Sequence, residues 1–171
     1  MPSILEPLRA LFGPQLQELA GGVVSGELPV TIAVVNRLIA QKLATAKAPI
    51  ISAEIETRPG ETFTARLRPK GPIPLLNVDV RIDRQPQLPD DSRLGMRWTL
   101  RGLGPLAMFA GPVIAYFKTL PAGITMDGDR IWVDVHALLR SQGLGEAVPL
   151  LTGLRVLTRE ERFLVQFEVR R

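Results

Sequence analysis

The residues of this 171-residue sequence that could carry acid–base chemistry centre on its single histidine. His136 follows Asp134 by two positions, so the two side chains would share a face in an extended strand and could form an Asp–His pair. Such a pair activates a nucleophile, yet the chain has no cysteine and no serine in a recognisable nucleophile motif. The pattern therefore favours His136 as a polar residue at the start of a helix.

The sequence also lacks the residue patterns that other kinds of catalytic, metal or cofactor site require. One histidine with scattered carboxylates supplies too few ligands for a metal site. The segment GLGPLAMFAG at 102–111 contains glycines, but it has neither the lysine nor the spacing of a phosphate loop, and it matches no dinucleotide fingerprint. We therefore predict a protein that is not an enzyme, with no catalytic residues, no bound metal and no cofactor.

Arginine supplies most of the positive charge of this basic chain, whose pI is about 10.1. The arginines on the polar phase of alternating segments are Arg66, Arg68, Arg81, Arg93, Arg97, Arg101 and Arg170. Acidic residues at 54, 56, 79 and 83 interleave with them, so cross-strand ion pairs on a solvent-facing sheet are one interpretation. The other is an anion-binding face for lipid headgroups or nucleic acid. The headgroup candidates are Arg66, Arg68, Arg97 and Arg101.

Aromatic residues weigh against nucleic acid as the partner of this face. Proteins that bind single-stranded nucleic acid stack bases on exposed aromatic side chains interleaved with basic ones. Here Trp98 falls in the buried phase of its segment, and only Trp132 falls in the polar phase.

An uncharged segment from Leu106 to Phe117 is unusual for a soluble protein. As a helix its 12 residues would be about 18 Å long, too short for a bilayer core, which needs about 20 apolar residues. Pro112 would kink this helix. It has a bulky face, comprising Leu106, Phe109, Val113, Tyr116, Phe117 and Leu120, which must be covered by the protein core, by a ligand, by a membrane interface or by a partner.

Helical periodicity also occurs near the start of the chain. Leucines recur at helical spacing over 1–22, with a break at Gly13 and Pro14. The segment 31–46 predicts a long amphipathic helix, in which Asn36 and Lys42 face away from the apolar side. The apolar stripe of that helix comprises Ile32, Val35, Leu38, Ile39 and Leu43.

Strict alternation of apolar and polar residues follows from position 50 onward and predicts antiparallel strands with one buried face. In the first of these strands we expect Ile51, Ala53 and Ile55 to point inward. Hairpin turns are predicted at Asp127-Gly128 and at TREER, 158–162. The fold class is therefore α+β: a curved antiparallel sheet of about eight strands, wrapped around or covered by the long helix, with an N-terminal helical segment and a proline-kinked apolar helix. We expect one domain over 1–171, with 1–22 as its helical segment and 23–171 as its body.

Three consecutive features resemble the tubular lipid-binding (TULIP) superfamily, in particular its small bacterial lipid-binding members. They are a short strand running into VVNRLIAQKLA (34–44), long alternating strands, and LPAGITMDGDRIWVDVHALL (120–139). The resemblance covers roughly 25–171 and implies that the helix at 31–46 is wrapped by the sheet beside an apolar groove for acyl chains. It further implies that the ligand touches Val35, Leu38, Ile39, Leu43, Phe109, Val113, Tyr116 and Phe117.

The sequence thus leads to a non-enzymatic binder of a lipid or another long apolar small molecule, associated through arginines with an anionic membrane surface. Two alternatives stay open: a protein–protein interaction or homo-oligomerisation module that uses 104–120, and a nucleic-acid binder. The N-terminus has no basic region of the kind found in secretory signals, so we expect a cytoplasmic protein that is peripheral at the membrane.

Overall fold

A computed structural model describes residues 22–45, 49–101 and 123–170 of the chain. The predicted helix over 104–120 and the predicted helical segment over 1–22, apart from its last residue, therefore lie outside the described residues. The described elements, in chain order, are β1 (Val23–Thr31), α2 (Ile32–Thr45), β2 (Ile50–Arg58), β3 (Thr62–Pro69), β4 (Leu76–Arg84), β5 (Arg93–Arg101), β6 (Ile124–Asp127), β7 (Arg130–Asp134), α4 (Val135–Ser141), the 3₁₀-helix η3 (Gly145–Leu150), β8 (Leu151–Arg159) and β9 (Arg162–Arg170).

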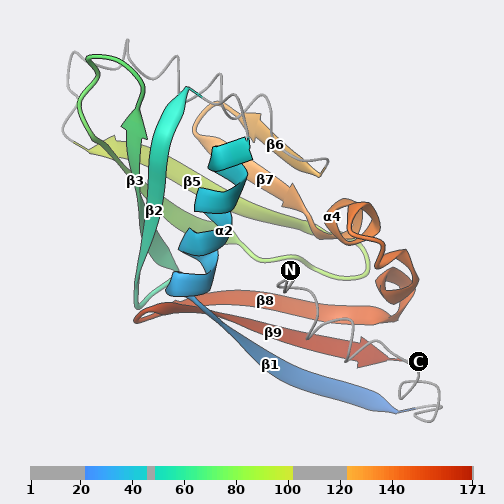
Figure 1. The fold of residues 1–171 in the computed structure, drawn as a ribbon. Helices are drawn as coiled ribbons and strands as arrows, with labels where there is room; N and C mark the ends of the chain where they lie inside the picture. Colours follow the sequence, from blue (N-terminus) through green and yellow to red (C-terminus); the bar gives the residue numbers. More distant parts are fainter. Residues whose placement is uncertain (1–21, 46–48, 102–122, 171) are drawn as a thin grey trace.

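The strands form two antiparallel sheets, so the predicted α+β class is confirmed. A six-stranded sheet has the order β2-β3-β4-β5-β7-β6, and a three-stranded sheet has the order β1-β9-β8. Figure 1 shows the six-stranded sheet above the three-stranded one, with α2 beside β2 and α4 near the opposite end. The described residues form nine strands, close to the expected number of about eight, but these strands form two sheets where one was expected.

Each sheet has an apolar inner face, as the alternation predicts, and the outer faces are polar except for a row of Pro29, Leu164 and Leu157 on the three-stranded sheet. On β4 the inner residues Leu76, Val78, Val80 and Ile82 are all buried, whereas Arg81 between them is exposed. On the three-stranded sheet, Phe167 and Val169 are buried, and their outer neighbours are polar. The predicted hairpins are also present: Asp127 pairs with Arg130, and Arg159 pairs with Arg162.

One strand departs from the predicted alternation at a β-bulge. The register of β2 against β3 shifts between Ile50 and Ser52, so Ile50 is buried and Ile51 is 58% exposed. The prediction that Ile51 points inward is therefore wrong. A bulge adds one residue to a strand and changes the face of the residues beside it, which a period of two does not anticipate.

Helix α2 packs along β2, which is an edge strand of the six-stranded sheet (Figure 1). Its residues Ile39 and Leu43 contact Ile50 and Ala53 in one apolar cluster. Asn36 does not face away from the sheet as predicted. Its side-chain amide donates to the Ile55 carbonyl at 3.1 Å and accepts from the Ile55 N–H at 2.7 Å, so it occupies backbone groups on the edge of the strand.

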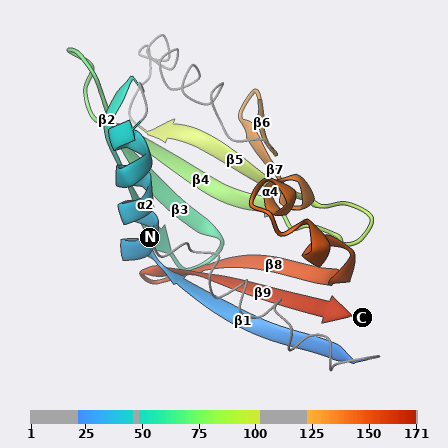
Figure 2. The ribbon, with the colours of Figure 1, turned by 45° about the vertical axis from the view of Figure 1, so that its right-hand side comes forward.

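The two sheets are joined at a corner near the β8–β9 turn (Figure 2). The Thr158 hydroxyl accepts the N–H of Thr62 at 3.0 Å, and the rings of Phe63 and Phe163 meet edge to face with centroids 5.4 Å apart. At the other end of the three-stranded sheet, Val135 of α4 packs in a cluster with inner residues of β8 and β9. In the described ranges no helix is long and apolar enough to cross a membrane.

Candidate functional site

Asp134 and His136 lie where β7 passes into α4, and the carboxylate of Asp134 caps the N-terminus of this helix. It accepts the Ala137 N–H at 3.0 Å as the N-cap of α4 and the Ser92 hydroxyl at 2.8 Å. These hydrogen bonds, led by the one from Ala137, lower the pKa of Asp134. The Nε2 atom of His136 is buried without a hydrogen-bond partner in the described part of the chain. Asp134 therefore orients the helix backbone, which matches the helix-start interpretation of this pair.

The inner faces of the two sheets form the candidate apolar site. They come together at the Phe63–Phe163 contact, and at the other end α4 and Leu88, which follows β4, pack on the inner face of the three-stranded sheet. Between these two ends, Leu28, Val165 and Val156 form one row across β1, β9 and β8, and each is only half-buried. This row supplies apolar surface that the described elements do not fully bury.

A second row crosses the inner face of the six-stranded sheet and carries two polar atoms. Register pairs Thr57 with Phe63, Phe63 with Val80, and Val80 with Trp98. The hydroxyl of Thr57 and the Nε1 of Trp98 are buried, and neither has a hydrogen-bond partner among the described residues. Because buried donors are nearly always satisfied, these two atoms mark places where a ligand or water would be stabilised.

The ligand contacts implied by the family resemblance divide into two groups. Val35, Leu38 and Ile39 are half-buried on α2, and Leu43 is buried against β2. The other four, Phe109, Val113, Tyr116 and Phe117, lie outside the described residues. The structure therefore describes the first group only. These four residues lie on α2, which packs along the edge strand of the six-stranded sheet.

The outer face of the six-stranded sheet holds the four arginines selected from the sequence as headgroup candidates, and three of them form ion pairs with described residues. Arg66 pairs with Glu56 at 2.8 Å, and Arg101 pairs with Asp79. Arg97 lies 3.3 Å from Asp129 and 3.9 Å from Asp83. Arg68 is exposed and has no ion pair with a described residue.

Trp132 lies on the same outer face, surrounded by cations. The guanidinium groups of Arg84, Arg93 and Arg130 lie 5.5 to 5.7 Å from its ring centre, within cation–π range. Gly95 on the neighbouring strand makes room for the ring, because a Cβ there would lie 2.9 Å from Cζ3 of Trp132. Sequence reasoning placed Trp132 in the polar phase but did not anticipate this cluster, which depends on the pairing of β5 with β7.

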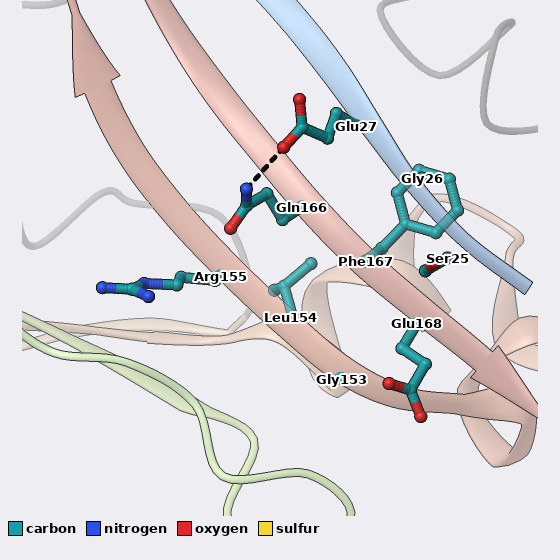
Figure 3. Close-up of a pocket in the computed structure, with 9 residues that line it drawn as sticks. All are labelled: Ser25, Gly26, Glu27, Gly153, Leu154, Arg155, Gln166, Phe167 and Glu168. Carbon is teal, nitrogen blue, oxygen red and sulfur yellow. Dashed lines mark hydrogen bonds between the residues drawn. The ribbon is translucent and has the colours of Figure 1, made fainter.

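Two hollows lined by described residues lie on the outer faces. The hollow on the three-stranded sheet, of about 450 Å³, has a mixed lining, with polar residues that include Ser25, Glu27 and Arg155 beside Leu154 and Phe167 (Figure 3). Glu27 accepts a hydrogen bond from Gln166 at 2.5 Å there.

The second hollow, of about 280 Å³, lies on the six-stranded sheet and is called the basic hollow below. Its lining includes Arg58, Arg81, Arg97 and Arg101 with Thr62 and Thr99. The sequence analysis selected Arg97 and Arg101 as headgroup candidates but missed Arg58 and Arg81. These four arginines are brought together by the register of three successive strand pairs, β2 with β3, β3 with β4 and β4 with β5. No local sequence pattern reveals this register.

No protein-family model, no curated protein and no solved structure matches this chain.

Proposed function

We propose that this chain is a non-enzymatic protein that binds a lipid or another long apolar ligand between the inner faces of its two sheets. The observation that carries the proposal is the half-buried row of Leu28, Val165 and Val156, which lies between the Phe63–Phe163 contact and the cluster around α4. The described residues also form three separate apolar clusters, whereas one contiguous core is usual for a domain.

The energetics favour selection by size and apolarity. Removing one methylene group of an acyl chain from water contributes about 0.8 kcal/mol, so a chain of several methylenes would bind without any directional contact. The unpartnered Trp98 Nε1 and Thr57 hydroxyl offer hydrogen bonds on the inner face of the six-stranded sheet. A ligand with a polar group on an otherwise apolar chain would satisfy one of them.

In this proposal α2 has the role of the helix beside the groove, as the TULIP resemblance implies. Its half-buried residues Val35 and Leu38 would extend the apolar wall beyond the edge strand β2. The outer face, with its many arginines, would meet anionic headgroups when the protein delivers or collects its ligand at a membrane.

The test is to purify the full chain under mild conditions and to identify any bound lipid by native mass spectrometry and extraction. A Val165→Trp variant, which fills the inner row with a bulky aromatic side chain, should lose the lipid. Leu164→Trp, which places the same side chain on the opposite face of β9, is the matched control and should retain it. Thermal unfolding of both variants checks that they are folded.

A lipid-free protein that forms a stable oligomer would replace the proposal with the interaction module. Salt-sensitive retention on heparin by a lipid-free protein would point to a nucleic-acid binder. A folded, lipid-free monomer would overturn the lipid proposal outright.

A further inference from the structure

The basic hollow on the outer face of the six-stranded sheet holds more positive charge than its surroundings neutralise. Four of the side chains that line it are arginines, and the carboxylate that lines it is that of Asp79. Both oxygens of Asp79 are engaged, since Oδ1 accepts the Thr64 hydroxyl at 2.8 Å and Oδ2 pairs with Arg101. Asp79 therefore compensates Arg101, and of the other three guanidinium groups in the hollow that of Arg97 alone has carboxylate partners among the described residues, Asp83 and Asp129.

Those three guanidinium groups keep hydrogen-bond donors available. Neither Arg58 nor Arg81 forms an ion pair or a side-chain hydrogen bond with any described residue. With the described residues, Arg97 forms the two long ion pairs, at 3.3 and 3.9 Å, and one of its partners, Asp83, is shared with Arg130. An arginine presents five N–H donors in a planar fork that matches the oxygens of a phosphate group.

The register makes this arrangement costly in the empty protein. Arg81 on β4 lies directly opposite Arg97 on β5. Like charges at directly opposed positions of an antiparallel pair destabilise it. Threonine occupies the flanking outer positions, with Thr62 opposite Arg81 on β3, and Thr99 two residues after Arg97 on β5. Hydroxyl groups beside uncompensated guanidinium groups complete a set of donors for an anion.

We propose that the basic hollow binds a phosphate-class dianion, either free phosphate or the phosphomonoester group of a larger molecule. A dianion would relieve the repulsion between Arg81 and Arg97 and accept charge-assisted hydrogen bonds from Arg58. The hollow of about 280 Å³ is larger than the space that a single water molecule needs, which leaves room for a phosphate group.

The arginines of this site lie on the opposite face of the sheet from the apolar site proposed above, although Phe63 and Val80 of the inner row also contribute to the lining of the hollow. Arg81 and Arg97 point outward, whereas their strand neighbours Val80 and Trp98 belong to the inner face. Phosphate binding would therefore proceed whether or not an apolar ligand occupies the inner face, and failure of one proposal leaves the other standing.

The first experiment is calorimetric titration of the full chain with inorganic phosphate at constant ionic strength. Arg81→Gln should weaken phosphate binding by about tenfold or more, because it removes hydrogen bonds to a charged group. Arg81→Lys keeps the positive charge but not the planar fork of donors, so its affinity for phosphate should lie between those of the wild type and Arg81→Gln. The matched control is Arg170→Gln, an equal change of charge at an exposed strand residue of the other sheet, which should leave the affinity within about twofold.

A second experiment distinguishes a soluble phosphate from a lipid headgroup as the source of the phosphate group. Vesicles of phosphatidylcholine with and without phosphatidic acid are tested for sedimentation of the protein. If the protein sediments only with vesicles that contain phosphatidic acid, and Arg81→Gln does not sediment with them, the hollow binds lipid headgroups. If the protein binds inorganic phosphate but does not sediment with these vesicles, the hollow binds soluble phosphates. The proposal is overturned if neither ligand binds, or if Arg81→Gln and Arg170→Gln reduce binding equally, because binding would then follow net charge alone. Thermal unfolding of each variant verifies its folding.

Discussion

The side-chain amide of Gln85 forms two hydrogen bonds to the backbone of Val156, from which it is 71 residues distant in sequence. Nε2 donates to the Val156 carbonyl at 2.8 Å, and Oε1 accepts the Val156 N–H at 2.9 Å. Val156 belongs to β8, an edge strand of the three-stranded sheet, and Gln85 directly follows β4 of the six-stranded sheet. Asn36 forms the same pair of hydrogen bonds with Ile55 on the edge strand β2. In both sheets an amide side chain satisfies backbone groups that an edge strand would otherwise present for pairing.

Removing the Gln85 amide should destabilise the joint between the sheets. Gln85→Ala leaves the N–H and carbonyl of a half-buried strand residue without these partners, and we expect unfolding free energy to fall by about 1–3 kcal/mol. Gln87→Ala, an exposed glutamine in the following turn, is the control and should change stability by less than about 0.5 kcal/mol. Urea unfolding measures both, and equal losses would contradict the role given to Gln85.

Asn36→Ala should expose the edge of β2. The Ile55 N–H loses its acceptor at 2.7 Å, so its amide hydrogen should exchange with solvent faster than in the wild-type protein. Gln41→Ala makes a similar change at an exposed position of α2 and should leave exchange at Ile55 unchanged. Hydrogen exchange followed by NMR reports on that single amide. Unchanged protection of Ile55 in Asn36→Ala would contradict the prediction.

Acidification should weaken the start of α4. The Ala137 N–H and the Ser92 hydroxyl hydrogen-bond to ionised Asp134 and lower its pKa in the folded protein. A carboxylate with a lowered folded pKa contributes stability that is complete above its ordinary pKa of about 4 and is lost as the pH falls through the lowered value. Asp134→Asn should therefore be less stable than the wild type at neutral pH, and the difference should shrink below about pH 4.

Chemical unfolding measured between pH 7 and pH 2 tests this dependence. Ser92→Ala removes one of the hydrogen bonds to Asp134 and should reduce the pH-dependent difference without abolishing it. Parallel loss of stability in the wild type and Asp134→Asn across this range would show that Asp134 contributes nothing specific.

Gly26→Ala should disturb the inner face of the three-stranded sheet. A Cβ at Gly26 would lie 2.6 Å from Cζ of the buried Phe167, so the ring must shift, and we expect a loss of about 1–3 kcal/mol. Gly145→Ala is the matched control, because a Cβ there would meet only Cγ of Arg140 at an ordinary 3.6 Å. Thermal unfolding compares the two variants. Equal stability would mean that Phe167 can move without cost.

Local patterns in the sequence predicted the strands and their faces well. The alternation in β4 gave four buried residues on one side, and the turn residues at 127–130 and 158–162 located two hairpins. These features depend on neighbouring residues, since a strand shows each face at every second position and a tight turn needs particular residues. The bulge that exposes Ile51 interrupts the period, and for that reason the pattern assigned that residue to the wrong face.

The candidate site was predicted less completely. The sequence placed Arg97 on a polar strand face, but it did not show that Arg81 lies opposite, or that Arg97 has only long contacts with its acidic partners. It likewise treated Asn36 as a solvent-facing helix residue, although its amide bonds the edge of β2. Each of these depends on the register or the packing of separate elements.

By itself, the sequence determined that this chain builds antiparallel strands with apolar inner and arginine-rich outer faces, because side-chain periodicity is a local property of the backbone. Only the tertiary structure decided that the strands divide into two sheets, that Gln85 meets Val156, and that four arginines gather in one hollow. Sheet order and register are set by contacts between residues far apart in the chain, where many pairings satisfy the same alternation and the packing of the whole molecule selects one.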